Sequence, residues 1–392
     1  MYKRQVKPLR KNPRIRPAAA AGFLLVHLAA LGVFWVGLSW KGVALCLASY
    51  YLRMFAITAG FHRYFSHRTY RLGRVPQFLL AFLGQTSAQK GVLWWASNHR
   101  HHHKYSDRPE DLHSPTQRGF WWSHMGWILA EDYEETNLSR IPDLVKFPEL
   151  LWLDRNMYLP TMLYGLALFL AFGPTGLFWG YFLSTVLLWH GTFTINSVMH
   201  VWGRKVFPTT DTSRNSFLLA LLTMGEGWHN NHHFYPGSAA QGFRWWQVDP
   251  SFYLLWAGEK AGIVRSLRRV PAHLKAASAA AEATRARLEE SMREKVDALS
   301  ARWAAISAAA QKGAQEKFVE MDAARARAAA RLEELQADYA AARQRAGDAA
   351  SRRIDELQAE IEGARLQLAQ LLEEMIERAE SMGLVPSEAG AL

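Results

Sequence analysis

Four apolar runs constrain this chain more than any other feature of its sequence. They cover residues 18–40, 42–60, 157–173 and 175–196. A helix needs about 20 mostly apolar residues to cross the roughly 30 Å hydrocarbon core of a bilayer. The runs therefore predict an all-α integral membrane protein with four transmembrane helices in two hairpins. The first run is longer than the apolar part of a signal peptide and a second run follows it, so we expect no cleavage there.

The distribution of basic residues predicts the side of the membrane on which the other segments lie. The first sixteen residues carry seven Lys and Arg and no acid, whereas the connections near Lys41 and at residues 173–175 are short and nearly uncharged. Lys and Arg accumulate on the cytoplasmic side of membranes. We therefore expect a basic cytoplasmic N-terminus at residues 1–17, with the loop 61–156 and everything after residue 196 on the same side. The net charge of +11 reflects this topology, and no nucleic-acid partner is expected.

A shorter apolar segment at residues 75–95 is interrupted by the polar sequence Gln-Thr-Ser-Ala-Gln-Lys. We expect a re-entrant or interfacial helix here and not a crossing, because the apolar part is too short to span a bilayer. Whether this segment crosses the membrane decides whether the histidine groups can share a metal site. If the segment crossed, His62 and His67 would lie on the opposite side of the membrane from the histidines at residues 99–103.

The composition changes after Pro271, which ends a membrane domain at residues 18–270. Residues 271–392 are rich in Ala, Arg and Glu and predict a long helical tail. A 3-4 spacing, typical of a coiled-coil seam, joins Ile354, Leu357, Ile361, Ala364, Leu368, Leu371 and Met375. The same spacing recurs over a shorter stretch at Val296, Leu299, Trp303 and Ile306. A coiled coil that makes a homo-oligomer and long solvated helices remain alternatives for this tail.

Ten of the 15 histidines lie in four groups on the predicted cytoplasmic side. The groups are His62 and His67; His99, His101, His102 and His103; His200, four residues after Asn196; and His229, His232 and His233. Residues at i, i+3 and i+4 share one face of a helix, so the triplets at 99/102/103 and 229/232/233 could each aim three imidazoles at one point. Imidazole binds iron, zinc and copper without thiolate, and the chain has a single Cys. The groups therefore predict a metal site built on nitrogen donors.

The order of these groups resembles that of the membrane-bound fatty-acid desaturases, with the acyl-CoA (stearoyl-CoA-type, delta-9) branch most similar. The resemblance covers about residues 20–270. It is carried by "HRYFSHRTYR", "WWASNHRHHHKYSD", "DLHSPTQRGFWWSHMGWIL", "INSVMH" and "GEGWHNNHHFYP". It implies a fatty acyl desaturase that introduces a cis double bond into a saturated acyl chain, using O2, two electrons and two iron ions.

The resemblance also implies the ligand set. Nine histidines would hold the iron ions, namely His62, His67, His99, His102, His103, His200, His229, His232 and His233. One iron would take the first pair and the outer positions of the second group, and the other would take the middle histidine, His200 and the whole third group. Asn196 would reach one metal through water. His101 occupies the free position of the HxxHH motif and is not expected to be a ligand.

Carboxylates have a smaller expected role. Soluble di-iron enzymes use Glu-x-x-His pairs from several helices, and this chain has one such pair, Glu226 and His229. We therefore expect Glu226 to orient an imidazole and not to bind metal directly. Asp107 and Asp111 either orient imidazoles in the same way or are polar residues at helix ends.

The substrate is expected in an apolar tunnel between the crossings and a cytoplasmic cap, in contact with Trp95, Asn98 and Trp228. Acyl-CoA is the carrier that the resemblance implies. Ser97 and Asn98 stand where animal acyl-CoA enzymes carry an Arg–Asp pair near the CoA head group, and this departure bears on the carrier. The sequence lacks the His-Pro-Gly-Gly motif of a haem-binding cytochrome b5 module. A separate ferredoxin, flavoprotein reductase or cytochrome is therefore the expected electron donor.

Three other functions fit parts of the sequence. A membrane di-iron lipid hydroxylase would share the metal site and differ in its product. A histidine-rich metal transporter would place ionisable residues along the crossings, where this chain has only His27, Arg53 and His190. A scaffold that recruits partners through the helical tail is compatible with an enzymatic membrane domain.

Overall fold

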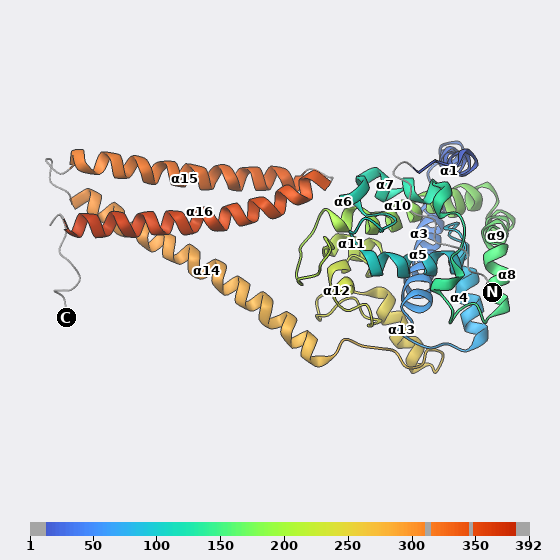
Figure 1. Cartoon of the computed structure of the whole chain (residues 1–392). Helices are drawn as coiled ribbons and strands as arrows, with labels where there is room; N and C mark the ends of the chain where they lie inside the picture. The colour runs from blue at the N-terminus through green and yellow to red at the C-terminus, as the bar shows by residue number, and fades with distance from the viewer. Residues whose placement is uncertain (1–12, 310–314, 345–347, 382–392) are drawn as a thin grey trace. The chain divides into compact units, whose positions relative to one another are not determined.

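The computed structural model describes residues 13–309, 315–344 and 348–381, and within these ranges the chain is helical, with isolated β-bridges and no strands. Contacts divide the chain into two compact units, Met1–Lys275 and Ala276–Leu392 (Figure 1). The first unit contains every predicted metal ligand. The second is the Ala-, Arg- and Glu-rich tail.

Three helical runs of the described chain are long and apolar enough to cross a membrane. The first, Pro17–Val36, consists of α1 (Pro17–Ala30) and α2 (Gly32–Val36). The second, Trp40–Ser66, consists of α3 (Trp40–Phe55) and the π-helix η1 (Ala56–Ser66). The third, Leu159–His200, consists of α9 (Leu159–Thr175), η5 (Gly176–Leu183), α10 (Ser184–Asn196) and η6 (Val198–His200).

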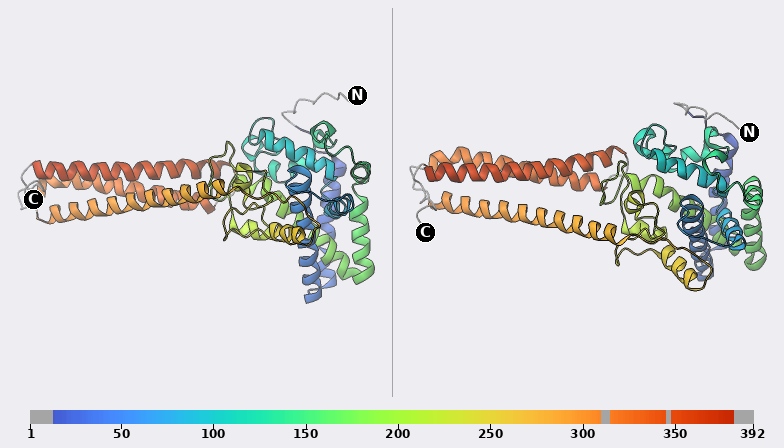
Figure 2. Two further views of the ribbon diagram at one scale, coloured as in Figure 1. Left: turned by 90° about the horizontal axis from the view of Figure 1, so that it is seen from below. Right: turned by 60° about the horizontal axis from the view of Figure 1, so that its bottom comes forward.

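The third run reverses direction in its middle. Gly173 has φ +62° and ψ −151°, a conformation that glycine adopts readily, and Pro174 follows it. The hydroxyl groups of Thr161 and Tyr181 lie 2.8 Å apart across the reversal. The helices before and after Gly173 therefore pack against each other as an antiparallel pair, which appears in green in Figure 2.

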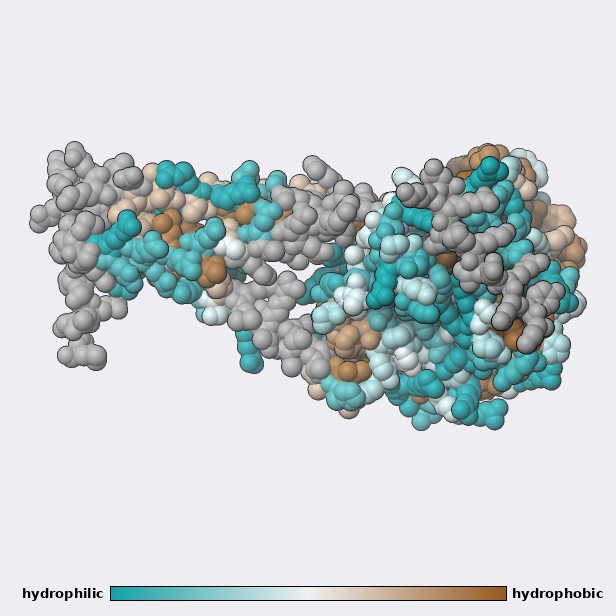
Figure 3. Space-filling view, in the orientation of Figure 1, coloured by the Kyte–Doolittle hydropathy of each residue, from teal (hydrophilic) through white to brown (hydrophobic). Residues whose placement is uncertain are grey.

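Apolar side chains cover the outer surface of these runs. Phe34 and Trp35 on α2 are 81% and 74% exposed, and Leu170 on α9 is 75% exposed. Figure 3 shows apolar residues gathered at the end of the first unit where α1 and α9 lie. A contiguous apolar surface of this kind requires an apolar environment such as lipid.

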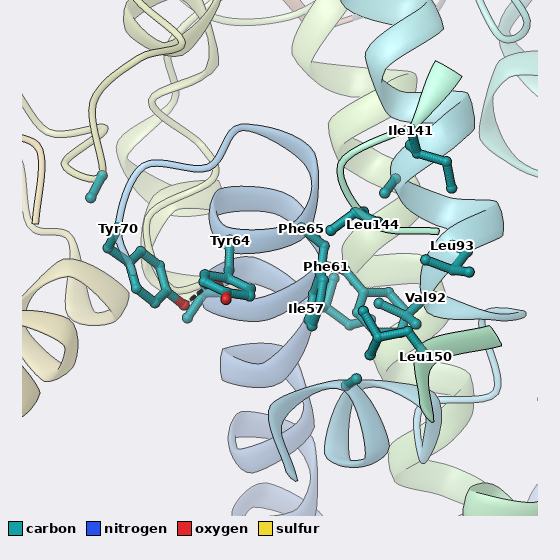
Figure 4. Packing of buried hydrophobic residues seen from close by; sticks show 14 of the residues in the cluster. Ile57, Phe61, Tyr64, Phe65, Tyr70, Val92, Leu93, Ile141, Leu144 and Leu150 are labelled. Atoms are coloured by element: carbon teal, nitrogen blue, oxygen red, sulfur yellow. Dashed lines mark hydrogen bonds between the residues drawn. The ribbon is translucent and has the colours of Figure 1, made fainter. Parts of the chain in front are cut away.

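Helix α4 (Arg74–Gln85) follows η1 and has only 12 residues, which is too short to cross a bilayer. A turn with positive φ at Ala88 and Lys90 leads from α4 to α5 (Val92–Tyr105). Phe61 and Phe65 of η1 pack with Leu93 of α5 in the largest buried apolar cluster (Figure 4). This packing places the first two histidine groups side by side.

Short helices complete the first unit around this core. They are α6 (Pro115–Arg118), α7 (Phe120–His124), η2 (Gly126–Leu129), η3 (Glu131–Tyr133), η4 (Leu138–Arg140), α8 (Pro148–Arg155), α11 (Phe217–Leu222), α12 (His229–Phe234) and α13 (Pro250–Lys260). Of these, α12 is the element that carries the third histidine group.

The tail consists of α14 (Ala272–Ala309), α15 (Gln315–Gln344) and α16 (Asp348–Ser381). Leu335 of α15 packs on Leu357 and Ile361 of α16, while Trp303 of α14 packs on Leu368 and Met375. The seam residues therefore pack within one chain. Of the predicted seam residues, Leu371 is only partly buried, whereas its neighbour Leu372 is fully buried. The side chain of Ile354, another predicted seam residue, lies outside the described residues. A coiled coil between copies of the chain stays a prediction.

Candidate metal centre

The predicted ligands converge into two buried groups. Within each group, one ring nitrogen of every histidine lies within 4.8 Å of the others. The group of five consists of His62, His67, His99, His103 and His232. The group of four consists of His102, His200, His229 and His233.

The π-helix η1 explains the unusual spacing of the first pair. Five residues separate His62 from His67, and at about 100° per residue an α-helix would point their side chains about 140° apart. In η1 the backbone N–H of His67 bonds to the carbonyl of His62, five residues earlier, at 3.2 Å. The wider turn of the π-helix brings the two imidazole rings to 4.9 Å between centroids.

Neither triplet aims all three imidazoles at one point, and on α5 the structure shows the division between outer and middle histidines that the resemblance implies. On α5, His99 and His103 lie in the group of five, whereas His102 lies in the group of four. On α12 the i+3 member, His232, again separates from the other two and joins the group of five, which also corrects the assignment of the whole third group to one metal. The reason is angular: i and i+4 differ by about 40° around a helix, while i+3 lies about 60° to the other side.

The distances between nitrogens fit bound metal ions. The Nε2 atoms of His62 and His103 each lie 2.9 Å from Nε2 of His232, and those of His200 and His229 are 3.1 Å apart. Two nitrogens that bind one metal at about 2.1 Å and at right angles to each other lie about 3 Å apart. The observed spacing is therefore that of neighbouring ligands on a common ion.

Protonation also fits a metal. Burial, followed by neighbouring imidazoles, lowers the pKa of His99, His103, His229 and His232 well below the usual value, so these rings are neutral at pH 7. Burial lowers the pKa of His233 to about 4, and its Nε2 has no hydrogen-bond partner within the described structure. Neutral imidazoles with free lone pairs are the form that binds metal.

Four buried carboxylates contact the far side of four of these rings. Glu226 contacts Nδ1 of His62. The Nδ1 atom of His102 lies 3.0 Å from the carboxylate of Asp111. Nδ1 of His200 lies 3.3 Å from Asp107, and Nδ1 of His233 lies 2.7 Å from Asp211. Each contact keeps the ring proton on Nδ1 and leaves the Nε2 lone pair facing the other nitrogens of its group. Such lone pairs repel one another unless a cation lies between them.

The carboxylates are ionised despite their burial. Burial raises the pKa of Asp107, Asp111, Asp211 and Glu226, but the adjacent imidazoles and hydrogen-bond donors more than compensate, and each pKa lies below its ordinary value. Glu226 also accepts hydrogen bonds from Gln241 at 3.0 Å and from Arg63 at 3.2 Å. Three of the four carboxylates, Glu226, Asp107 and Asp111, are candidates from the sequence because they lie close to histidine motifs. Asp211 is not, because it lies outside every histidine motif and reaches His233 only through the fold of a loop.

His101 lies apart from both groups, with its Nε2 2.9 Å from the carbonyl oxygen of Glu110. This position agrees with its place in the free position of the HxxHH motif. His113 also lies outside the two groups, and its ring stacks on that of His102 at 4.2 Å between ring centroids. His102, His113 and Asp111 form a third, smaller set of possible ligand atoms.

A cavity of about 400 Å³ leads to the histidine groups, a volume in the usual range for small-molecule sites. Its walls are mainly apolar, and Trp95, His99 and Asn196 lie where it approaches the metal centre. These three residues also line a second cavity of about 30 Å³, which touches members of both groups. The two cavities therefore share a wall beside the histidine groups.

The structure separates the three predicted substrate contacts. Trp95 lines both cavities and stacks on His99 at 4.8 Å between ring centroids. Asn98 and Trp228 line neither cavity. The side-chain oxygen of Asn98 accepts a hydrogen bond from Arg140 at 3.4 Å, and the indole N–H of Trp228 donates to the carbonyl of Val248 at 2.8 Å. The geometry therefore does not support substrate contact by Asn98 or Trp228.

Comparison with known proteins adds an independent result. A family model described as "Fatty acid desaturase" matches residues 38–262. The chain is 33% identical over 273 residues to the sn-2 palmitoyl-lipid 9-desaturase of Nostoc sp., covering 68% of this chain and 95% of that protein. It is 35% identical to the sn-1 stearoyl-lipid 9-desaturase of Synechocystis sp., covering 67% and 84%. It is 36% identical to the acyl-CoA C20 Delta5-desaturase of Anemone leveillei, covering 60% and 76%.

Proposed function

The chain belongs to the fatty acid desaturase family, and we propose that it introduces a cis double bond at the delta-9 position of a saturated acyl chain at a two-iron centre. As a fatty acyl desaturase it is an oxidoreductase. The observation that carries the two-iron proposal is the convergence of nine imidazoles into groups of five and four. The 9-desaturases among the relatives support the position of the double bond.

Each part of the site has a distinct role in this proposal. Two iron ions, when bound, supply the redox chemistry that uses O2 to remove hydrogen from an unactivated methylene. The group of five histidines holds one ion, and the group of four holds the other with Asn196 acting through water. The four carboxylates orient the ligand rings and fix their protons, as such partners do at other metal sites. The apolar walls of the cavity exclude water and hold the acyl chain beside the centre.

The proposed topology has four crossings, because the third candidate run reverses at Gly173. The N-terminus, all histidine groups and the C-terminus lie in the cytoplasm, which the basic N-terminal segment supports. Electrons come from a separate ferredoxin, flavoprotein reductase or cytochrome on that side. The carrier is acyl-CoA or an acyl lipid, and relatives act on each.

The test combines product and metal analysis. We expect a desaturase-deficient host that expresses the chain to accumulate delta-9 cis-unsaturated fatty acid methyl esters. The purified active protein should contain two iron ions per chain, and protein loaded with zinc, which imidazole also binds, should be inactive. Hydroxylated acyl chains as the main product would favour the hydroxylase alternative. One metal or none in active protein would end the two-iron proposal.

The tail provides a second prediction. Because the second compact unit begins at Ala276 and contains no predicted ligand, a chain that ends at Lys275 should retain most of its desaturation. Its oligomeric state or membrane distribution should change, which gel filtration in detergent and imaging would measure. A truncated protein that binds its full complement of iron and makes no product would contradict this.

A further inference from the structure

Three histidines outside the two metal groups form a continuous hydrogen-bonded chain. His27 lies in α1, His190 in α10 and His124 at the end of α7. Nε2 of His27 lies 3.1 Å from Nε2 of His190, and Nδ1 of His190 lies 2.9 Å from Nε2 of His124. Nδ1 of His124 lies 2.9 Å from the hydroxyl of Ser197, the residue that directly follows α10. The chain therefore joins two helices of the proposed crossings to the cap and ends one residue from Asn196.

The carbonyl oxygen of Phe23 sets the direction of this chain. It lies 2.8 Å from Nδ1 of His27 and can only accept, so His27 carries its proton on Nδ1 and accepts at Nε2. Charge is costly inside a crossing, and burial, followed by the neighbouring His190, lowers the pKa of His124 to about 4. All three rings are therefore neutral at pH 7. His190 and His124 then each donate from Nε2 and accept at Nδ1.

Helix α7 holds the end of α10 at two consecutive residues. Nδ1 of His124 accepts from the hydroxyl of Ser197, although the carbonyl oxygen of Phe193 also lies 3.0 Å from that hydroxyl. The hydroxyl of Ser123 donates to the carbonyl of Asn196 at 2.7 Å. Both serines are fully buried. The last turn of a helix leaves backbone carbonyls without partners in the helix, and here α7 supplies one of the missing donors.

The side chain of Asn196 depends on this support. Asn196 lines both cavities beside the histidine groups. Its side-chain amide makes no hydrogen bond within the part of the chain that the structure describes, so the backbone at the end of α10 sets its direction. A misplacement of about 1 Å at a reacting centre can cost about 100-fold in rate. The contacts that fix this backbone are therefore expected to affect turnover.

We propose that this chain of three histidines, together with Ser123, positions the end of α10 and thereby aims the Asn196 side chain at the metal centre. The inference rests on the proposed function, which gives Asn196 its role through water. The first crossing then supports turnover through His27, although none of the nine predicted ligands lies on α1.

A double-mutant cycle on the iron-loaded full chain in lipid nanodiscs tests this inference, with stearoyl-CoA and stearoyl-phosphatidylglycerol as substrates. His124→Phe keeps an aromatic ring and removes both hydrogen bonds. It should lower kcat about 10-fold, as loss of an orienting partner at a metal site does, with KM changed less than twofold and two iron ions retained. Asn196→Ala should lower kcat at least as much. The double variant should lose no more than Asn196→Ala alone, because His124 acts through Asn196.

Conservative variants separate the links of the chain. His124→Asn places an amide near the position of Nδ1 and can keep the contact with Ser197, so it should recover most of kcat. His190→Phe removes the next link and should lower kcat less than His124→Phe does. His273→Phe, the same change at an exposed position in α14, is the control and should match the wild type.

Hydrogen exchange of backbone amides gives a measurement that does not depend on turnover. The amides of residues 196–200 should exchange faster in His124→Phe and in Ser123→Ala, because the end of α10 opens more readily without its partners in α7. The amides of α16, in the second compact unit, are the reference. Ser123→Ala removes a single hydroxyl, and it repeats the cycle with Asn196→Ala if His124→Phe does not fold.

Three results would each overturn the proposal: losses that multiply in the double variant, loss of iron in proportion to kcat, and unchanged exchange at residues 196–200. The inference and the proposed function can also fail separately. If the wild type forms no desaturated product while exchange at residues 196–200 responds to His124→Phe, the support of α10 by α7 stands and the desaturase proposal fails. If product forms and neither kcat nor exchange responds to His124→Phe, the positioning role fails and the desaturase proposal stands.

Discussion

His99→Ala, His102→Ala and His103→Ala should each abolish desaturation, whereas His101→Ala should retain most of it. The first three histidines belong to the two buried groups, while His101 lies beside the carbonyl of Glu110. Removal of one ligand leaves one ion with too few ligands, and the remaining imidazoles are then no longer held in the orientation that binds it. Fatty acid methyl esters from cells with matched expression of each variant measure the effect.

Metal analysis of the same variants sharpens this prediction. His99 and His103 contribute to the group of five and His102 to the group of four, so all three variants should contain fewer than two iron ions per chain. His101→Ala should contain two and serves as the matched control from the same helix. Equal loss of activity at all four positions would refute the division of α5 into ligands and a spare residue. Equal retention at all four would refute the metal site itself.

Asp211→Asn should lower activity and iron affinity by about 10–100-fold, the usual effect of removing a partner that orients a metal ligand. The Asp211 carboxylate lies 2.7 Å from Nδ1 of His233 and also accepts hydrogen bonds from the backbone N–H and hydroxyl of Ser213. The amide of Asn fills the same volume but carries no charge, so it stabilises the Nδ1 proton of His233 less. Competition with a chelator measures the change in iron affinity.

Asp297→Asn, the same change at an exposed position in α14, provides the control. A stable Asp211→Asn protein with wild-type iron affinity and wild-type turnover would show that the carboxylate does not support the centre. Asp211→Glu, which retains the charge, should recover part of the activity and thereby separate the role of charge from that of packing.

Local spacing pointed to the two helical histidine triplets, and the resemblance to the membrane-bound fatty-acid desaturases implied the full set of nine ligands. Groups such as His99, His102 and His103 are read directly from the chain, and the structure brings all nine predicted ligands into the two groups. Each triplet divides locally, because the i+3 member points to the other side of the helix from the i and i+4 members. Which metal group each part joins depends on how α5 and α12 face each other, and the spacing of the histidines does not encode that arrangement.

Residues that act across the fold were missed for a similar reason. Asp211 and Gln241 lie in loops, and each meets the site through segments distant in sequence. Conversely, Asn98 and Trp228 were expected at the substrate because of their position beside histidine motifs. The side chain of Asn98 faces Arg140, since neighbouring residues on a helix such as α5 point in directions about 100° apart. Trp228 precedes α12 in a non-helical conformation, and its indole faces the carbonyl of Val248.

The π-helical turn between His62 and His67 makes the number of residues in this segment as important as their identity. Deleting one residue between the two histidines would allow an ordinary α-helix with the rings about 40° apart, and helix stability would rise. The deletion would also rotate the residues on one side of it relative to those on the other. Arg63 would then lose its alignment with its buried partners Glu226 and Asp249. Because every residue of η1 is buried, an insertion or deletion there would displace many contacts at once, whereas a substitution changes one side chain. For protein engineering, η1 is therefore a segment in which a more regular helix would disrupt the histidine pair and the buried ion pairs of Arg63.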